Sequence, residues 1–207
     1  MEDRQFVLIV QIVSKKRGNM RRILAVVDVQ QLFLSCRDEF GPLARVDYAK
    51  LYRSFITEPG DVVDAVAYVV VSPKHEDAKF LRFLKKQGYR TFRLYAGIDP
   101  NYKDGELSNT RIIPRNWTYR MTKELMAWAV GTNYDYFYIV SGSNQFTGPI
   151  KAIHAVNKKC TVMSFRSSLP PDYTKSGADD YIFLDQQFLY DEHLYKKVPV
   201  PLIDGKV

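Results

Sequence analysis

The chain has 207 residues, of which 46% are hydrophobic, 26% are charged and 14% are aromatic. This composition is typical of a globular protein and excludes a disordered, collagenous or low-complexity chain. The length suits one large domain, or one domain with appendages. Because 30 Lys and Arg residues stand against 23 Asp and Glu residues, the net charge is +7, which favours an anionic partner such as nucleic acid.

The N-terminal segment carries a short apolar run, FVLIVQIV, at residues 6–13. This run is far shorter than the roughly 20 residues that span a bilayer, so it does not predict a membrane-spanning helix. Basic residues follow it in place of a small-residue cleavage site, which argues against a signal peptide. We expect residues 1–19 to form an extension or an extra strand, residues 20–185 one domain, and residues 186–207 an irregular C-terminal arm.

The first convincing strand is ILAVVDV at residues 23–29, a continuous apolar run typical of a strand buried on both faces. Its only charge, Asp28, lies near its C-terminal end. Helical spacing and β-branched runs then alternate along the chain. In chain order the pattern predicts helices over 31–40 and 47–56, a strand over 62–71, a helix over 76–87, a strand over 89–95, a helix over 117–130, a strand over 134–140, a helix over 149–156, and strands over 161–165 and 181–184.

This order of elements predicts the fold class. Strands that alternate with helices imply right-handed crossovers and a mainly parallel sheet, so we expect a three-layer α/β/α domain. Ligands of such sheets bind outside the carboxyl ends of the strands, near a switch in strand order. Two polar loops directly follow apolar strands: Asp28 with Gln30 and Gln31, and SGSNQF at residues 141–146. The stretch 96–116 is polar and has no regular period, and a connection of this length inside a compact domain is typically functional or mobile.

The chain lacks the common nucleotide and metal motifs. It contains no GxGxxG after the first strand and no P-loop, so a dinucleotide or nucleotide site has no support. The cysteines Cys36 and Cys160 are too few for a disulfide scaffold, and we expect reduced thiols and a cytoplasmic location. The histidines His75, His154 and His193 show no zinc spacing and are interpreted as ordinary histidines.

Four segments resemble the NYN domain, a family of PIN-like ribonucleases that includes the LabA-type proteins. They are VDVQQL at 27–32, YDYFYIVSGSNQF at 134–146, SSL at 167–169 and ADDYIFL at 178–184. The resemblance runs in order from about residue 22 to residue 185 and so covers most of the chain. It implies a PIN-like fold and metal-assisted hydrolysis of phosphodiesters, in which clustered carboxylates hold Mg²⁺ or Mn²⁺.

The sequence departs from the family at most of its acidic positions. Asp28 is retained, but Ser143 and Gln145 stand where the resemblance places two aspartates. Thr118 stands at the principal acidic position of the next motif, and Glu124 at a secondary one. The resemblance therefore implies a degenerate site in which Asp28 is the residual catalytic and metal-binding residue and Glu124 a doubtful one. Such a site needs no cofactor and binds Mg²⁺ or Mn²⁺ at most weakly.

Each of these residues also has a structural interpretation. Asp28 can cap a helix at a strand–helix junction, and Glu124 can form an i,i+4 ion pair with Arg120. The polar turn at residues 143–145 can be structural, or it can bond to RNA phosphates and bases. Arginines interleaved with aromatics suit stacking on single-stranded bases. The candidate RNA-binding residues are Gln30, Gln31, Arg111, Arg115, Trp117, Tyr119, Arg120, Lys123, Ser143, Asn144 and Gln145.

Three functions remain open from the sequence. The first is an RNA-binding pseudo-nuclease, with single-stranded RNA as its partner and no membrane partner. The second is a divergent Mg²⁺- or Mn²⁺-dependent ribonuclease that uses Asp28 with Glu124 and a carboxylate from Asp179 or Asp180. The third is an interaction or assembly scaffold that forms a homo-oligomer through the apolar segment at residues 6–13.

Overall fold

The computed structural model describes residues 20–71, 78–95, 97–98, 111–112, 117–169 and 177–190. The expected N-terminal extension and most of the expected C-terminal arm lie outside these residues. The described residues form a parallel six-stranded sheet with the strand order β3-β2-β1-β6-β7-β8. Its strands are β1 (Arg22–Asp28), β2 (Val62–Val71), β3 (Tyr89–Tyr95), β6 (Tyr136–Val140), β7 (Lys159–Phe165) and β8 (Asp180–Leu184).

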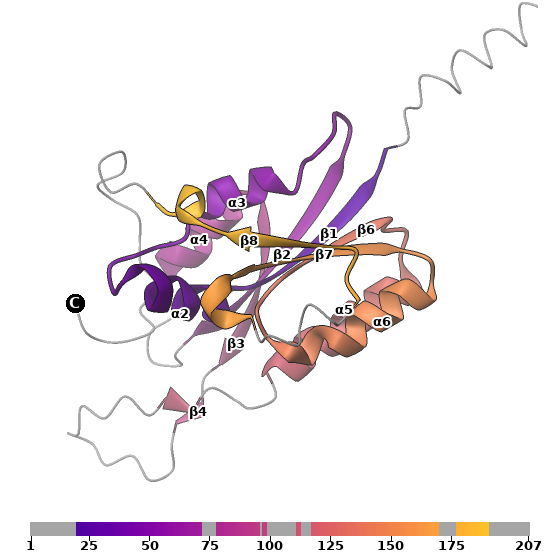
Figure 1. Ribbon diagram of the computed structural model, residues 1–207. Coiled ribbons are helices and arrows are strands. Elements are labelled where there is room, and N and C mark those ends of the chain that lie inside the picture. Colours follow the sequence, from indigo (N-terminus) through magenta and orange to yellow (C-terminus); the bar gives the residue numbers. More distant parts are fainter. Residues whose placement is uncertain are drawn as a thin grey trace, which may run out of the picture.

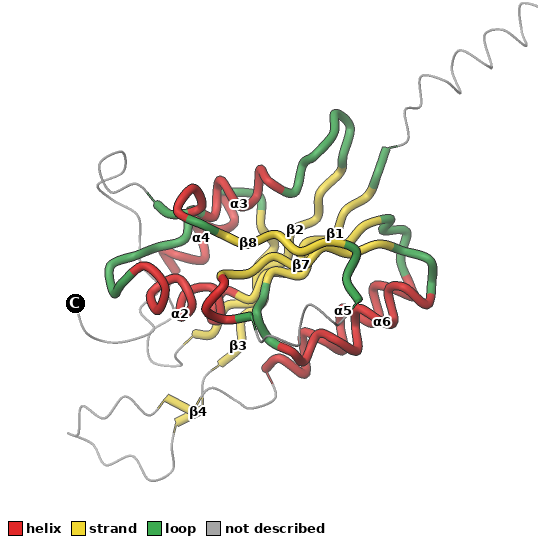
Figure 2. Tube along the Cα trace, in the orientation of Figure 1, coloured by secondary structure: helices red, strands yellow, loops and turns green. Residues whose placement is uncertain are grey.

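Helices cover both faces of this sheet (Figures 1 and 2). One layer contains α2 (Val29–Phe40), α3 (Tyr48–Ser54) and α4 (Ala78–Lys86), whose apolar side chains pack on one face of β1 and β2. The other layer contains α5 (Trp117–Gly131) and α6 (Thr147–Ala155), which pack on the opposite face. The predicted three-layer α/β/α class with a parallel sheet is therefore confirmed.

The central strand β1 explains why the sheet is buried on both sides. Its side chains from Ile23 to Asp28 are inaccessible to solvent and alternate between the two layers. Leu24 and Val26 face α5 and α6, while Ala25 and Val27 face the other layer. Burial of a leucine or valine of this kind is worth about 1.5–3 kcal/mol, so a strand with no polar face suits only a central position.

The chain enters the sheet at the central strand β1 and adds strands first on one side of it and then on the other. From β1 it moves outward through β2 to β3, and then returns to β6 on the other side of β1. The strand order therefore switches between β1 and β6, whose register pairs Val27 with Val140. At such a switch the loops after the two strands diverge to opposite faces and leave room for a ligand. This edge positions Asp28 and the loop after Val140.

Small differences from the predicted boundaries have physical causes. Helix α2 begins at Val29, two residues before the predicted start, because the preceding residue Asp28 acts as its N-cap. Helix α6 begins at Thr147 and includes Pro149, since proline is tolerated in the first turn of a helix. The predicted N-cap of α3, Asp47, is confirmed by bonds from the backbone N–H groups of Ala49 and Lys50.

The polar stretch 96–116 contains regular structure that its sequence does not indicate. Two short strands, β4 (Gly97–Ile98) and β5 (Arg111–Ile112), pair antiparallel in a sheet of their own. A two-residue strand is too short to show an alternating pattern, so periodicity does not detect it. The other residues of this stretch lie outside the described part of the chain.

Candidate functional site

Asp28 lies at the centre of the carboxyl edge, between β1, α2 and the loop after β6. Its carboxylate is fully buried, and each oxygen accepts a hydrogen bond. Oδ1 accepts from the backbone N–H of Gln31, 2.7 Å away, and thereby caps α2. Oδ2 accepts from the hydroxyl of Ser141, 3.1 Å away. The carboxylate therefore ties together the first strand, the helix that follows it and the loop across the switch point.

The environment of Asp28 disfavours its charge. Burial raises the pKa of Asp28 to about 7, although the hydrogen bonds from Gln31 and Ser141 act in the opposite direction. Two hydrogen bonds do not replace the hydration that a carboxylate has in water. At neutral pH a substantial fraction of Asp28 is therefore protonated, which makes it a weaker ligand for a divalent cation than an exposed aspartate.

The loop after β6 is held in place by small polar contacts. The N–H of Ser143 donates to the hydroxyl of Ser141, 3.2 Å away. The hydroxyl of Ser143 in turn accepts from the N–H of Gln145, 3.4 Å away, and caps the short 3₁₀ helix η1 (Asn144–Phe146). Phe146 is buried against α5 and α6, while Asn144 and Gln145 are exposed. The turn thus presents neutral donors and acceptors to solvent.

Gly142 permits a close approach between the loops after β6 and β7. A Cβ at this position would lie 2.4 Å from the Ser168 hydroxyl oxygen and 2.5 Å from its backbone carbonyl oxygen. Ser168 belongs to the 3₁₀ helix η2 (Arg166–Ser168), and its hydroxyl is bonded to that of Ser164, 2.7 Å away. Only glycine fits between these groups without a shift of backbone.

Glu124 is paired within the protein. It accepts a hydrogen bond from the phenol of Tyr68 and one from Arg120 Nε, at 2.9 Å. The predicted i,i+4 pair is therefore confirmed. Tyr68 is paired with Asp28 in the register of β1 and β2, so Glu124 is tied through this phenol to the strand next to β1. The remaining acidic position of the resemblance is occupied by Thr118, which is buried at the start of α5.

The donor set does not fit a carboxylate-held Mg²⁺ or Mn²⁺. Among the described residues, Asp28 and Glu124 belong to no group of three or more Asp, Glu, His or Cys side chains close enough to share an ion. Each of the two acids already has protein partners, and Arg120 offsets the charge of Glu124. These cations take hard, charged oxygen ligands. Asp28 is partly protonated at neutral pH and Glu124 is already paired with Arg120, so the two carboxylates make a weak site.

Sequence reasoning missed two residues of this edge. The sequence marks Ser141 only as the start of a polar loop, although its hydroxyl donates directly to Asp28. Tyr68 belongs by its sequence to an apolar strand, and only the pairing of β1 with β2 reveals its position next to Asp28.

The predicted residue Gln30 is buried, with 2% of its surface exposed, and its Oε1 has no hydrogen-bond partner. The neighbouring Gln31 bonds through Nε2 to Ser35, 3.2 Å away.

Residues 22–185 match the family model of the NYN domain. The chain belongs to the NYN domain family. The NYN domain of this chain is similar to a protein of unknown function from Vibrio parahaemolyticus, with 22% identity and a TM-score of 0.65 over 84% of this chain and 98% of that one. At this identity the likeness shows the fold alone.

Two further solved structures resemble the NYN domain more distantly. One is the C-terminal domain of a hydrogenase from Pyrococcus furiosus, with 13% identity and a TM-score of 0.37 over 69% of this chain and 91% of that one. The other is a protein from Arabidopsis thaliana in complex with UDP, with 12% identity and a TM-score of 0.40 over 80% of this chain and 42% of that one. The search of curated proteins found no match.

The candidate RNA-contacting side chains of the NYN domain are described only in part. On α5, Tyr119 and Lys123 are exposed, and the guanidinium of Arg120 lies 5.9 Å from the centre of the Phe92 ring. Arg111 begins β5 and Trp117 begins α5, but their side chains lie outside the description, as does all of Arg115. Helix α5 begins near the carboxyl ends of the strands because it runs antiparallel to them.

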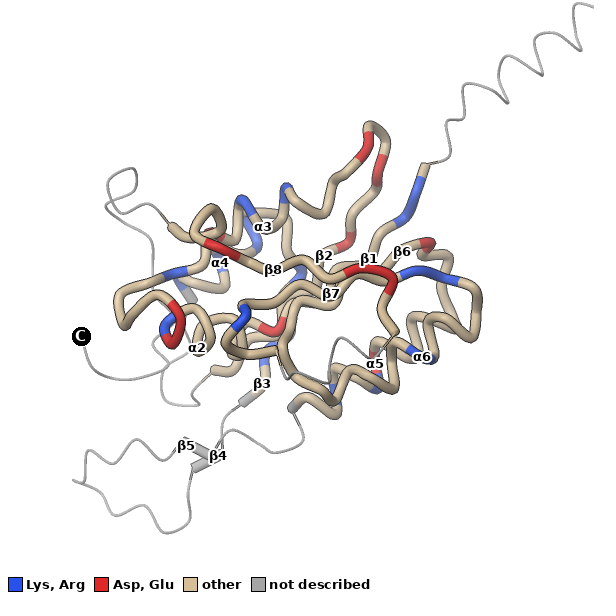
Figure 3. The backbone as a smooth tube through the Cα atoms, in the orientation of Figure 1, with Lys and Arg blue, Asp and Glu red and all other residues tan. Residues whose placement is uncertain are grey.

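Positive charge is spread around the NYN domain. Figure 3 shows Lys and Arg on elements of both helix layers and at both ends of the sheet. Some of these residues have structural partners: Arg90 makes two hydrogen bonds to Asp64, at 2.7 and 2.6 Å. The described positive charge therefore does not single out one edge. No helix among the described residues is long and apolar enough to cross a membrane.

A contribution of Asp179 or Asp180 to the site of Asp28 is excluded by the register. Asp180 begins β8 and pairs with Thr161, two positions before Met163, which is level with Val140 and Val27; Asp28 follows Val27, so Asp180 lies three positions behind it. That is about 10 Å along the strands, and β8 is also three strand spacings of about 4.8 Å from β1. These aspartates therefore lie near the opposite edge of the sheet from Asp28.

The close packing of Gly142 predicts a selective loss of stability. Gly142→Ala should lower the free energy of unfolding by about 1–3 kcal/mol, because the added methyl group overlaps backbone atoms of Ser168. Urea unfolding measures this change. Gly148→Ala in α6 is the control, because its Cβ meets nothing within 4 Å; it should leave the stability unchanged or raise it by up to about 1 kcal/mol. Equal effects of the two substitutions would contradict the packing argument.

The raised pKa of Asp28 predicts a pH-dependent contribution to stability. The folded state binds this proton more tightly than the unfolded state, so the contribution is complete below about pH 4 and is lost as the pH rises through about 7. Relative to Asp28→Asn, the wild type should therefore lose up to about 4 kcal/mol of stability over this range, at about 1.36 kcal/mol per pKa unit. Asparagine is the matched substitution because it also caps helices well. Unfolding of both proteins from pH 4 to 8 measures the difference, and a difference independent of pH would refute the shift.

Proposed function

We propose that this NYN domain binds single-stranded RNA at the switch point and has largely lost the metal site needed to cleave it. The observation that carries the proposal is the state of Asp28, which is buried and bonded through both oxygens to the protein's own backbone and Ser141. The family resemblance supplies the class of ligand. The chemistry of the edge argues for binding over hydrolysis.

Loss of carboxylates makes this edge more suitable for an anionic ligand. In place of two aspartates, the turn after β6 carries Ser143 and Gln145, whose neutral groups do not repel phosphate. Exposed amides such as those of Asn144 and Gln145 can donate hydrogen bonds to phosphates or to base edges. The same substitutions that weaken cation binding therefore remove a source of repulsion.

Helix α5 supplies the charge and the aromatic surface that support RNA binding. This helix contacts η1 in the loop after β6, and its first two turns carry Tyr119 and Lys123, both exposed. An exposed tyrosine can stack on an unpaired base, and an exposed lysine can neutralise a phosphate. Arg120 is less available because it is already paired with Glu124. The expected ligand is therefore a flexible single strand whose bases can reach the helix.

Substitutions in α5 test this proposal. Lys123→Gln should reduce the salt dependence of binding to a single-stranded oligonucleotide by about 0.7 in the slope of log K against log salt, the value for one lost phosphate contact. Tyr119→Ala should weaken binding by about 1–3 kcal/mol through lost stacking. Filter binding of the wild type and the variants at several salt concentrations measures both effects.

The control for charge is Lys50→Gln in α3, which removes the same charge from the opposite helix layer. It should leave the salt slope close to that of the wild type. If the wild type has no affinity for RNA at low salt, or an affinity that ignores ionic strength, the proposal is wrong. Equal effects of Lys50→Gln and Lys123→Gln would place the RNA elsewhere on the surface.

Restored acids test the claim that the metal site is lost. Mn²⁺ should neither raise the thermal midpoint of the wild type nor support RNA cleavage. Ser143→Asp combined with Gln145→Asp should produce a midpoint that rises with Mn²⁺ concentration, because ligand binding to the folded state stabilises it. Aspartate at position 143 also preserves the cap of η1.

Asn144→Asp is the matched control for this experiment, since it adds an acid to the same exposed turn at a position that the resemblance does not assign to a ligand. It should show little Mn²⁺ response. Mn²⁺-dependent RNA cleavage by the wild type, abolished by Asp28→Asn, would instead establish the divergent ribonuclease.

A further inference from the structure

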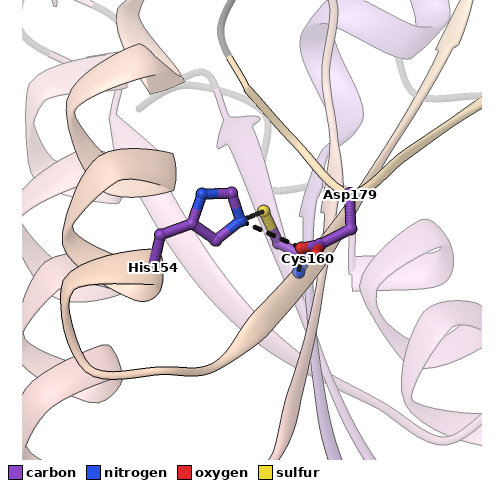
Figure 4. Close-up of side chains that lie close together, drawn as sticks. All are labelled: His154, Cys160 and Asp179. Atoms are coloured by element: carbon purple, nitrogen blue, oxygen red, sulfur yellow. Dashed lines mark hydrogen bonds and ion pairs between the residues drawn. The ribbon is translucent and has the colours of Figure 1, made fainter.

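Three side chains with metal-binding atoms meet at the amino edge of the sheet, opposite the edge that carries Asp28. His154 lies near the end of α6, Cys160 near the start of β7, and Asp179 just before β8. One nitrogen, sulfur or oxygen atom from each lies within 4.8 Å of the other two. Figure 4 shows the thiol and the carboxylate on the same side of the imidazole, with dashed lines from one ring nitrogen to each of them.

The backbone holds this cluster in position. Asp179 Oδ2 accepts from the N–H of Cys160, 2.8 Å away, and the N–H of Asp179 donates to the carbonyl of Cys160, 3.0 Å away. His154 Nε2 is 2.9 Å from the same carboxylate oxygen and 3.8 Å from Cys160 Sγ. These contacts fix the carboxylate against β7 and aim a single imidazole nitrogen at both of the other groups.

We propose that His154, Cys160 and Asp179 form a Zn²⁺ site with three protein ligands and one open position. A sulfur, an imidazole nitrogen and a carboxylate oxygen are the ligand types that Zn²⁺ takes, whereas Mg²⁺ and Ca²⁺ take oxygen alone. Tetrahedral bonds of about 2.0–2.3 Å place neighbouring ligand atoms about 3.3–3.8 Å apart. The sulfur–nitrogen distance of 3.8 Å meets this range, and the nitrogen–oxygen distance of 2.9 Å must widen by a few tenths of an ångström. The sulfur and the oxygen lie within 4.8 Å of one another, and binding must bring this distance into the same range.

The charges around the cluster suit a dication that enters from the surface. Side chains of His154 and Asp179 are each 35% exposed, whereas Cys160 is fully buried beneath them. The carboxylate of Asp179 contacts the N–H of Cys160 and the imidazole of His154, and Lys159 is close enough to act on it electrostatically. Nearby Lys158 points away, because its ammonium donates to the carbonyls of Ala129 and Thr132.

Binding must displace the thiol proton. Burial, assisted by the charge of Asp179, raises the pKa of Cys160 to about 12 when no cation is bound. A Zn²⁺ ion reverses this balance, since a coordinating thiol is deprotonated by the ion itself. The thiolate and Asp179 then offset the two charges of the ion. The bound ion would join α6, β7 and the start of β8, away from the proposed RNA site.

Cobalt substitution tests this site in the full-length protein. Co²⁺ added to the metal-free protein should give a sulfur-to-cobalt charge-transfer band in the near ultraviolet, and one equivalent of Zn²⁺ should remove it. Cys160→Ala should abolish the band, while Cys36→Ala, at the other buried cysteine, should preserve it. His154→Gln and Asp179→Asn should each weaken Co²⁺ binding at least as much as the roughly 10- to 100-fold loss caused by removal of a supporting contact.

Two results would overturn the proposal: no charge-transfer band in a folded wild type, or an unchanged band in Cys160→Ala. Circular dichroism checks that each variant is folded. If Cys160→Ala does not fold, Asp179→Asn takes its place in the test, because the asparagine keeps an oxygen that can accept from the N–H of Cys160. The site lies away from the proposed RNA site, so Tyr119→Ala and Lys123→Gln, which should weaken RNA binding, should leave the cobalt band unchanged. A hydrogen-bonded cluster without a cation is the outcome that a missing band would establish.

Discussion

The carboxyl edge of this domain depends on one buried carboxylate. Asp28 ends a strand that is buried on both faces, and its two oxygens cap α2 and hold the loop after β6. Removing a carboxylate from water is expensive, and two hydrogen bonds offset only part of that cost, which is why its pKa rises to about 7. Because Asp28 stabilises the fold through these two hydrogen bonds without a metal ion, its presence alone is poor support for catalysis.

Local pattern was sufficient to predict most of the fold. Apolar runs identified the six strands of the parallel sheet, and helical spacing identified the helices of both layers. The cap by Asp28 and the pair between Arg120 and Glu124 were also predictable, because both interactions are local in sequence. The bond from Tyr68 to Glu124 was not, since it depends on strand order and on the register of β1 with β2. Contacts between distant elements follow from topology, which periodicity does not encode.

The neighbours of a carboxylate decide what it can do as much as its position in a family motif. Glu124 stands at a plausible acidic position, but Tyr68 and Arg120 already satisfy it. Asp28 stands at the retained position, but burial favours its protonated form. Both acids have protein partners, so two features support the proposed loss of the metal site: Ser143 and Gln145 stand at positions that the resemblance assigns to aspartates, and the acids that remain are already bonded within the protein.

The two edges of the sheet show why ligand spacing in sequence is a limited guide to cation sites. Zinc motifs are recognised when neighbouring ligands come from one local segment. His154, Cys160 and Asp179 come from three elements and meet because β7 pairs with β8 while α6 returns to the start of β7. Their spacing carries no motif, and the histidine was interpreted as ordinary for that reason. Chemistry separates the edges further: the carboxyl edge offers hard oxygen donors that already have protein partners, whereas the amino edge offers sulfur and nitrogen beside a carboxylate. A cation that prefers soft donors therefore has a better site at the edge that the family resemblance does not assign to catalysis.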